Sequence, residues 1–508
     1  MSILPRRISP RFALLALVAL AVVVAVVLSF VLREGDIPTP TDGIGDIPAA
    51  HLVPEDVALY VGVSLDPDGA PWQEAFTLFE RLGVEDPFGG IREGVEADGE
   101  VDWEAEIEPF LGGAAVLFVS RFDSGEDEPL PGAVIFEARD ARAAEAVIHD
   151  RRTDTYSEGV YEGVSYRVME RGGVLAVMGG YFVYASDEET LRAIVDARQG
   201  RSLPLADSDD FRRLRNALEG DALAFVYLNP GALMPKVRGE AAEEAEEAPP
   251  DLLSIVGLDA LFERPLGVVV RADGGGFSLQ AAMLGDPGPI VPLLRPRDSR
   301  FAAMVPAETA VFVSAYDIAG VVDDAFGSTG LAARLRDAVL DEAEEADGLA
   351  AIEDLLALLD GELAYALWPS ADGGDAEIVI LAEVDDDREE RARDLLGELF
   401  AEPLAAGDLA LSVGDGIAVI GSSAAAIEAV RSGSSPSLAG SERFSTAVAR
   451  LDAPLATFAY IDIVRLLAPG EDDLEGLNLD GDGLGLIVNL VLEDDRLQVE
   501  AALTAGAD

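Results

Sequence analysis

Apolar and polar residues alternate with a period of two in several short stretches of the chain, which is typical of half-buried β-strands. Between these stretches, apolar residues recur every three to four positions and predict amphipathic helices. The predicted strands of the first half are 57–64, 114–120, 133–139, 164–170, 174–179, 181–186, 223–229 and a hairpin at 265–284; the predicted helices are 71–83, 101–111, 141–150, 186–197 and 207–218. The order begins β-α-β-β-α-β, the ferredoxin-like split order. Mixed runs of this kind predict an α+β fold with largely antiparallel sheet and helices. Ser186 with Glu189 fits a capping box at the start of helix 186–197.

One apolar stretch of sequence occurs twice in the chain in similar form. Residues 53–66 read VPEDVALYVGVSLD and residues 305–318 read VPAETAVFVSAYDI, so Pro54 and Pro306 lie 252 positions apart. Further strand and helix blocks match at offsets that fall to 220 near the C-terminus. The offset changes between blocks, as loop shortening in a second copy would produce. The acidic run 238–250 has no counterpart and is expected to be a surface loop. The pattern predicts two duplicated α+β domains, each starting with the ferredoxin-like order.

The run 12–32 has 21 residues without a charge, and as a helix it is long enough to span the ~30 Å hydrocarbon core of a bilayer. Arginines precede it and acids follow it, which places the N-terminus in the cytoplasm and the bulk of the chain outside. Its length favours an uncleaved anchor, with a cleaved signal peptide as the alternative. The predicted map is a cytoplasmic N-terminus at 1–11, a transmembrane helix at 12–32, a Pro- and Gly-containing tether at 33–50, a first repeat at 51–284, a Pro-rich linker at 285–300 and a second repeat at 301–508.

The charge balance is strongly acidic, with 95 acidic against 36 basic residues and a formal net charge of -59. Phosphate binding needs clustered Lys and Arg, so we expect no nucleic-acid partner. The self-repulsion of so many acids favours a saline, halophilic-like setting that screens it. A GC-rich coding bias is the alternative, because it also explains why Lys236 is the one lysine. The absence of cysteine excludes disulfides and thiolate chemistry.

No catalytic signature stands out from the sequence. His51 and His149 lack the paired spacing of a zinc site. Serine-nucleophile and P-loop motifs are absent as well. Glycoside hydrolysis asks only for two carboxylates roughly 5 to 10 Å apart, but among 95 acids the sequence selects no pair. We therefore predict no catalytic, cofactor-binding or metal-binding residue and no cofactor, and a non-enzymatic role is favoured while enzyme status stays open.

The best metal candidate is the stretch 478–483, NLDGDG. It places Asn478, Asp480 and Asp482 at positions 1, 3 and 5 of a calcium loop, with glycine at position 6. Position 12 is Asn489 instead of a bidentate Glu, and the following residues read as a strand. A turn that leads into a closing hairpin is the favoured interpretation, and calcium binding is the alternative.

Three blocks carry a family resemblance: Pro54 to Tyr60, Trp103 to Gly113 and Tyr184 to Leu191. With the apolar N-terminal run before them, these blocks make the chain resemble the bacterial envelope proteins grouped as the domain of unknown function 3352. The likeness extends over nearly everything after residue 50. It implies a single-pass or exported bacterial protein and no particular activity.

The leading hypothesis is a membrane-anchored envelope protein with a non-catalytic binding or scaffolding role outside the membrane, toward an unidentified envelope protein or ligand. A first alternative is a carrier of lipid or another apolar ligand, which requires a cavity of several hundred Å³ in or between the repeats. A second alternative is a carboxylate-dependent hydrolase, which requires convergent acids in a cleft. The three hypotheses require different features in the structure. A cavity of this size favours the apolar-ligand carrier over the binding or scaffolding role.

Overall fold

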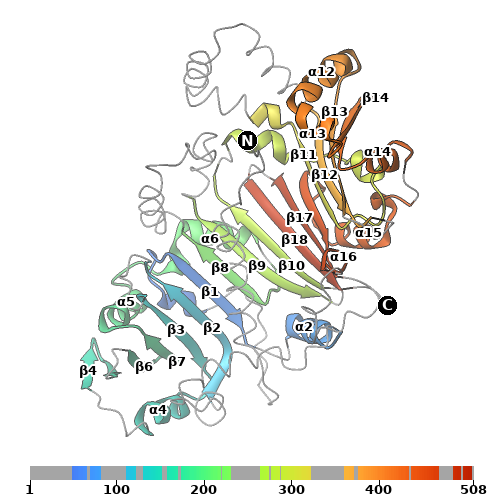
Figure 1. Ribbon diagram of the computed structural model, residues 1–508. Coiled ribbons are helices and arrows are strands. Elements are labelled where there is room, and N and C mark those ends of the chain that lie inside the picture. The colour runs from blue at the N-terminus through green and yellow to red at the C-terminus, as the bar shows by residue number, and fades with distance from the viewer. Residues whose placement is uncertain are drawn as a thin grey trace, which may run out of the picture. The chain divides into compact units, whose positions relative to one another are not determined.

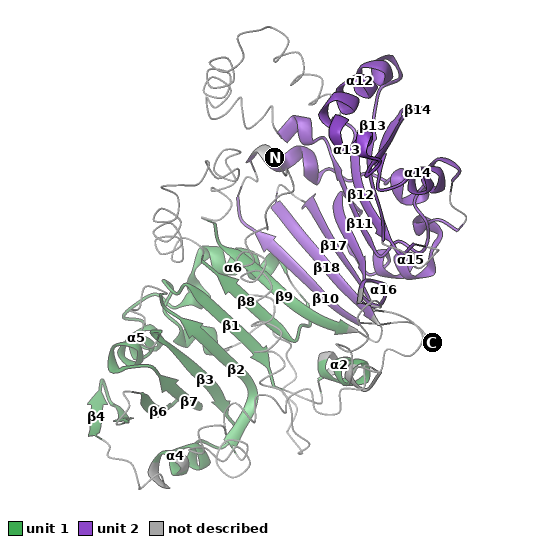
Figure 2. Cartoon of the chain, viewed as in Figure 1, with its two compact units in different colours: residues 1–243, 263–274 green, residues 244–262, 275–508 purple. Residues whose placement is uncertain are grey.

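The computed structural model describes residues 48–65, 69–81, 110–121, 130–150, 157–169, 173–218, 220–229, 264–273, 276–285, 288–321, 360–370, 376–433, 436–467, 484–493 and 496–505. The chain divides into two compact units (Figure 2). Unit 1 comprises residues 1–243 and 263–274, and unit 2 comprises 244–262 and 275–508. No helix in the described ranges is long and apolar enough to cross a membrane, and the predicted span at 12–32 lies outside them.

Unit 1 is built on one antiparallel sheet with helices (Figure 1). Its strands are β1 (Leu59–Ser64), β2 (Leu111–Val119), β3 (Gly132–Ala138), β4 (Ser157–Tyr161), β5 (Val164–Val168), β6 (Val174–Met178), β7 (Tyr181–Ala185), β8 (Ala224–Leu228) and β9 (Leu266–Asp273). They lie side by side in the order β9-β8-β1-β2-β3-β7-β6-β5-β4, and every pairing is antiparallel. The α+β class with antiparallel sheet is confirmed.

The helices of unit 1 bury one apolar stripe each. They are α2 (Ala70–Arg81), α4 (Ala141–Asp150), α5 (Glu188–Arg198) and α6 (Asp209–Ala217), with short 3₁₀ segments η2 (Pro48–Leu52) and η5 (Leu205–Asp207). On α5 the buried residues include Leu191, Ile194 and Val195, the spacing that one helix face requires. Trp72 of α2 is 1% exposed and donates its indole N–H to the Ser64 carbonyl at 2.9 Å, so the ring is part of the core.

The strands of unit 2 also pair antiparallel with one another. Its strands are β10 (Gly276–Met283), β11 (Val311–Tyr316), β12 (Glu362–Trp368), β13 (Glu377–Glu383), β14 (Ala410–Gly414), β15 (Ile417–Gly421), β16 (Thr457–Asp462), β17 (Leu484–Glu493) and β18 (Arg496–Ala505). Their order is β10-β18-β17-β16-β11-β12-β13-β15-β14. Its helical segments are η8 (Gly288–Leu294), η9 (Phe301–Ala303), η10 (Asp386–Arg388), α12 (Glu389–Leu399), α13 (Ala401–Ala406), α14 (Ala424–Arg431), η11 (Leu438–Gly440), α15 (Glu442–Val448) and α16 (Ile463–Leu467).

Every residue of β15, Ile417–Gly421, is buried. On one face Ile417 and Val419 join the main core of unit 2 with α14 and α15. On the other face Ala418 and Ile420 pack with Leu396 of α12. A strand that is covered on both faces reads as a continuous apolar run, which explains why IAVIG shows no alternation.

Several local contacts occur at matching places in the two units. The matching contacts are Gly132 N to Ser186 Oγ and Ile378 N to Ser422 Oγ, each 3.0 Å; Leu205 N to the Val53 carbonyl and Leu438 N to the Val305 carbonyl, 2.7 and 2.9 Å; and the bridges Pro54–Pro204 and Pro306–Ser437. Along the two sheets, β8-β1-β2-β3-β7-β6 and β16-β11-β12-β13-β15-β14 pair in the same sequence. The ferredoxin-like order stays a prediction.

The start of α5 corrects one prediction. The N-cap is Asp187 and not Ser186, because the Asp187 carboxylate accepts the Thr190 N–H at 2.7 Å. Ser186 instead donates to Asp187 and accepts from Gly132 N. Burial acts against the charged form, but the hydrogen bonds from Thr190 and Ser186 outweigh it and lower the pKa of Asp187. The carboxylate therefore stays ionised at the positive end of the helix dipole.

Candidate binding pocket

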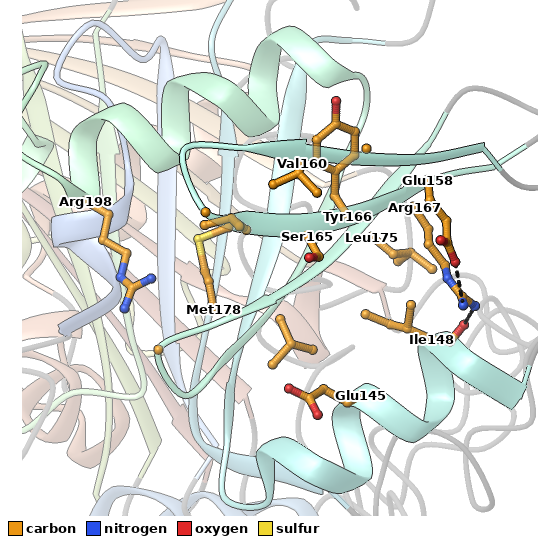
Figure 3. A pocket seen from close by; sticks show the side chains of 15 residues that line it. Glu145, Ile148, Glu158, Val160, Ser165, Tyr166, Arg167, Leu175, Met178 and Arg198 are labelled. Atoms are coloured by element: carbon orange, nitrogen blue, oxygen red, sulfur yellow. Dashed lines mark hydrogen bonds and ion pairs between the residues drawn. The ribbon is translucent and has the colours of Figure 1, made fainter.

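A pocket of about 720 Å³ lies within unit 1, between α4, the hairpin of β4 and β5, and strand β6 (Figure 3). Its apolar lining residues are Ile148, Val160, Val164, Leu175, Val177 and Met178. Its charged lining residues are Glu145, Glu158, Arg167 and Arg198. The volume is in the range of sites for small molecules, roughly 300–1,000 Å³, and the wall combines these apolar side chains with a slightly larger share of polar surface.

Helix α4 forms the floor. The helix begins directly after Asp140, whose carboxylate accepts the N–H groups of Arg142 and Ala143 at 2.9 and 3.2 Å and so caps its first turn. Ala144 and Ile148, four positions apart, are both buried and fall on one helix face. Glu145 lies beside this face and extends toward the cavity (Figure 3).

The hairpin of β4 and β5 forms the roof. Its turn consists of Glu162 and Gly163 with φ values of 49° and 83°, the left-handed pair that a two-residue type I′ turn requires. Strand register places Val160 opposite Ser165 and Glu158 opposite Arg167. Side chains alternate across a strand, so these four residues share the face toward α4.

The opposite face of the hairpin is fixed to α5. Tyr161 donates to Asp196 at 3.2 Å, and its ring lies 5.5 and 5.6 Å from the guanidinium groups of Arg192 and Arg201. Desolvation, and after it the hydrogen bond to Asp196, raises the pKa of the Tyr161 hydroxyl, so it remains a donor. Tyr166 donates to Glu188 of α5 at 2.9 Å. These contacts hold the roof in place without a ligand.

A tight approach of two residues sets the shape of the roof. A Cβ atom on Gly159 would lie 2.2 Å from the Tyr166 ring, because the ring covers this glycine from the neighbouring strand. Tyr166 is only 8% exposed as a result. Glycine is therefore required at residue 159 for the ring to lie where it does.

Arg167 closes one end of the pocket. Its guanidinium donates to the Ile148 carbonyl near the end of α4 and to Glu158 at 3.1 Å (Figure 3). A cation is favoured at that carbonyl, because the C-terminal end of a helix carries partial negative charge. The charge of Glu158 is neutralised by the same contact. Both charges are used to join α4 to the hairpin.

Arg198 lies at the other end, where the chain turns from β6 to β7 (Figure 3). Among the described residues it makes no hydrogen bond or ion pair, and the same holds for Glu145. Within the described part of the chain, Arg198 and Glu145 are thus an unpaired cation and an unpaired carboxylate in the pocket wall, an arrangement that can orient a ligand with a polar end.

The residues that the sequence singled out lie elsewhere. His51 is exposed in η2, and the side chain of His149 in α4 lies outside the described part, as do Asn478, Asp480, Asp482 and the acidic run 238–250. Within the described ranges no three His, Asp or Glu side chains are grouped for a metal ion. Asn489, position 12 of the calcium pattern, is buried in β17, where its amide binds the Ala456 N–H and the Pro454 carbonyl.

Of the two carboxylates that line the pocket, Glu158 pairs with Arg167, and the carboxylate-dependent hydrolase stays a prediction. The sequence reasoning also missed a buried carboxylate in unit 2. Glu362 is 1% exposed and accepts hydrogen bonds from Ser299, from Ser314 at 2.8 Å and from Arg300 N at 2.8 Å. These donors satisfy a charge that has no cationic partner within the described contacts, and they fasten residues 299–301 to β12.

Comparisons with known proteins give few relatives. No curated protein matches the chain. Two solved structures are similar to it, entitled "Structure of crystal form III of TP0453" and "Structure of crystal form IV of TP0453". Both are 10% identical, with TM-scores of 0.24 and 0.25, and the matches cover 48% of this chain and 80% and 81% of those chains. The family described as protein of unknown function (DUF3352) matches residues 13–400, and the chain therefore belongs to the DUF3352 family.

Proposed function

We propose that this protein is a membrane-anchored binding protein of the cell envelope that holds a small, largely apolar molecule in the unit 1 pocket. The observation that carries the proposal is the pocket of about 720 Å³, whose mixed wall includes the apolar side chains of β5, β6 and α4. Of the roles open to this sequence, the apolar-ligand carrier is the one that needs such a cavity. A scaffold without a ligand does not need it.

The pocket is preformed, and this supports a binding role. The roof is fixed to α5 through Tyr161 and Tyr166, and Arg167 joins the roof to the floor. A site that is ordered before the ligand arrives loses little conformational entropy on binding. The mouth is also accessible, because Val160 on the roof is 69% exposed. An exposed valine in the wall of the pocket gains from contact with an apolar ligand.

Two further parts of the proposal concern the chain as a whole. The uncharged run 12–32 anchors the protein, with residues after it outside the cytoplasmic membrane. The two units are copies of one domain, since their strands pair in the same sequence and the same backbone contacts occur in both. Copies diverge most easily in peripheral hairpins and loops.

The test uses the full chain in lipid nanodiscs and a photoactivatable diazirine analogue of 1-dodecanol. We expect saturable crosslinking to peptides of α4 and β4 to β6. Ser165→Trp puts a large side chain on the cavity face of β5 and should lower the yield roughly tenfold. Ser157→Trp is the matched control, because residue 157 lies on the same hairpin and is not among the lining residues. Crosslinking that does not saturate, or that Ser165→Trp leaves unchanged, rules out the proposed pocket.

A further inference from the structure

We infer that the ligand of the unit 1 pocket is an amphiphile with one anionic head, a carboxylate or a phosphodiester, and that Arg198 binds this head at the β6–β7 end of the pocket. The inference rests on the proposed function and adds a ligand class and a specificity-determining residue to it. The apolar body of the ligand lies against Val160, Leu175 and Val177.

Arg198 lies against the turn between β6 and β7. A Cβ atom on Gly179 would lie 2.1 Å from a terminal nitrogen of Arg198, so the guanidinium rests directly on this glycine. Gly179 has a φ of 58°, which a side chain at that position would also oppose. Glycine at residue 179 therefore leaves space for the guanidinium, because it has no Cβ atom, and it also permits the positive φ of the turn.

The charge of Arg198 is free for a ligand, in contrast to its neighbours. Arg192 pairs with Glu188 at 2.7 Å, and Arg201 pairs with Asp196 and Glu162 at 2.7 and 2.8 Å. Arg198 has no such partner among the described residues. In a chain with 95 acids and 36 basic residues, a cation left unpaired beside a cavity is a position where the ligand can supply the anion.

Glu145 limits the ligand to one negative charge. Its carboxylate lines the same cavity from α4 and has no cationic partner in the described contacts. A second anionic group on the ligand would be repelled by it. Arg167 does not compensate, because it is committed to Glu158 and the Ile148 carbonyl. The arrangement therefore suits a single anion at the Arg198 end and an uncharged body beyond it.

The net charge of -59 explains why the ligand also needs an apolar body. The field of the whole protein opposes the approach of a free inorganic anion. Burial of apolar surface provides about 25 cal/mol per Å² and does not depend on that field. The apolar part drives binding, and Arg198 fixes the direction in which the ligand lies and selects its head.

The test compares photoactivatable diazirine probes that share a 12-carbon chain: dodecanoate, 1-dodecanol, dodecylammonium and a dodecyl phosphodiester. The full chain in zwitterionic nanodiscs is crosslinked over a concentration series. Arg198→Gln should weaken dodecanoate binding roughly two- to fivefold, as expected for an exposed ion pair, and leave dodecanol unchanged. Glu145→Gln should strengthen dodecanoate roughly twofold. Arg212→Gln is the control, since Arg212 is an exposed arginine of unit 1 that pairs with Asp209 away from the pocket.

The outcomes separate the two proposals. If Arg198→Gln weakens carboxylate and alcohol equally, or if dodecylammonium binds best, the anionic-head inference is wrong while saturable binding still supports the pocket. If no probe saturates, both proposals fail. Tighter binding of the phosphodiester than of dodecanoate supports the inference with a lipid head group as the source of the anion, and the reverse order supports it with a free fatty acid.

Discussion

Replacement of Gly159 by Ala should destabilise the roof of the pocket strongly for so small a change. The new Cβ would lie 2.2 Å from the Tyr166 ring, so either the ring or the strand must move. If the ring moves, Tyr166 loses its burial and its 2.9 Å hydrogen bond to Glu188, and a bond to a charged acceptor is worth about 1.5–3 kcal/mol. If the strand moves, overpacking costs about 1–3 kcal/mol. We expect a loss of about 2–3 kcal/mol in the local opening free energy.

Hydrogen exchange followed by mass spectrometry is the suitable assay, because it reports on peptides of the hairpin and α5 separately from those of unit 2. The control is a double-mutant cycle with Tyr166→Ala. In that background the ring is absent, so Gly159→Ala should cost less than about 0.5 kcal/mol. An equal loss with and without the tyrosine would refute the steric explanation, and so would protection of the hairpin that Gly159→Ala leaves unchanged.

Three other predictions concern stability. Raising NaCl from 0.1 to 1 M shortens the Debye length from ~10 to ~3 Å. Because this screens the repulsion within a chain of net charge -59, the Tm should rise. A flat or falling Tm would contradict the screening argument. Burial raises the pKa of Tyr227 and of Tyr460 to about 12, against ~10 for a free tyrosine. Their contribution is complete below pH ~10 and is lost as the pH rises to about 12, at up to ~1.4 kcal/mol per pH unit each. Denaturant midpoints between pH 9 and 11.5 measure this loss, and a pH-independent midpoint would show that neither group stays protonated. Gly397 lies in α12, and no atom lies near a Cβ added there. Gly397→Ala should therefore raise the free energy of unfolding by about 0.5–1 kcal/mol. An unchanged midpoint in urea would contradict this prediction.

The strands could be predicted from the sequence where the local pattern of apolar residues alone was sufficient. The predicted strand 57–64 is observed as Leu59–Ser64 and the predicted strand 181–186 as Tyr181–Ala185. Both are apolar, flanked by turns and buried, so local pattern and tertiary packing favour the same structure. The helix start at Asp187 was missed by one residue. Two consecutive cap-forming residues, Ser186 and Asp187, offer the same signal, and only the contact between Gly132 and Ser186 decides between them.

The pocket was not predictable from local patterns. Strand β4 has the sequence SEGVY, whose exposed and polar residues resemble a loop because the strand lies at the edge of the sheet. Arg198 reads as an ordinary basic residue in the last turn of a helix, and its role depends on Gly179, which approaches it only in the folded chain. The sequence did contain one signal, a change in the offset between its two halves. Between the equivalent strand pairs, the offset falls from 246 (Val379 and Ala133) to 236 (Gly421 and Ala185), so the first half has ten additional residues there.

Those additional residues lie where the structures of the two units differ. Leu175 and Val177 line the pocket on β6 and pair with Tyr184 and Phe182, while Leu411 and Val413 of β14 pair with Ile420 and Ala418 at the same distance from the next turn. In unit 2, Val413 belongs to a closed apolar cluster with Leu396 of α12, and in the described pairings the sheet ends at β14. In unit 1 the sheet continues into β5 and β4. The pocket lies between this hairpin and α4. Unit 1 has a cavity beside this hairpin, and unit 2 has a packed apolar cluster between α12 and its sheet, so the proposed binding role rests on positions that the two units do not share.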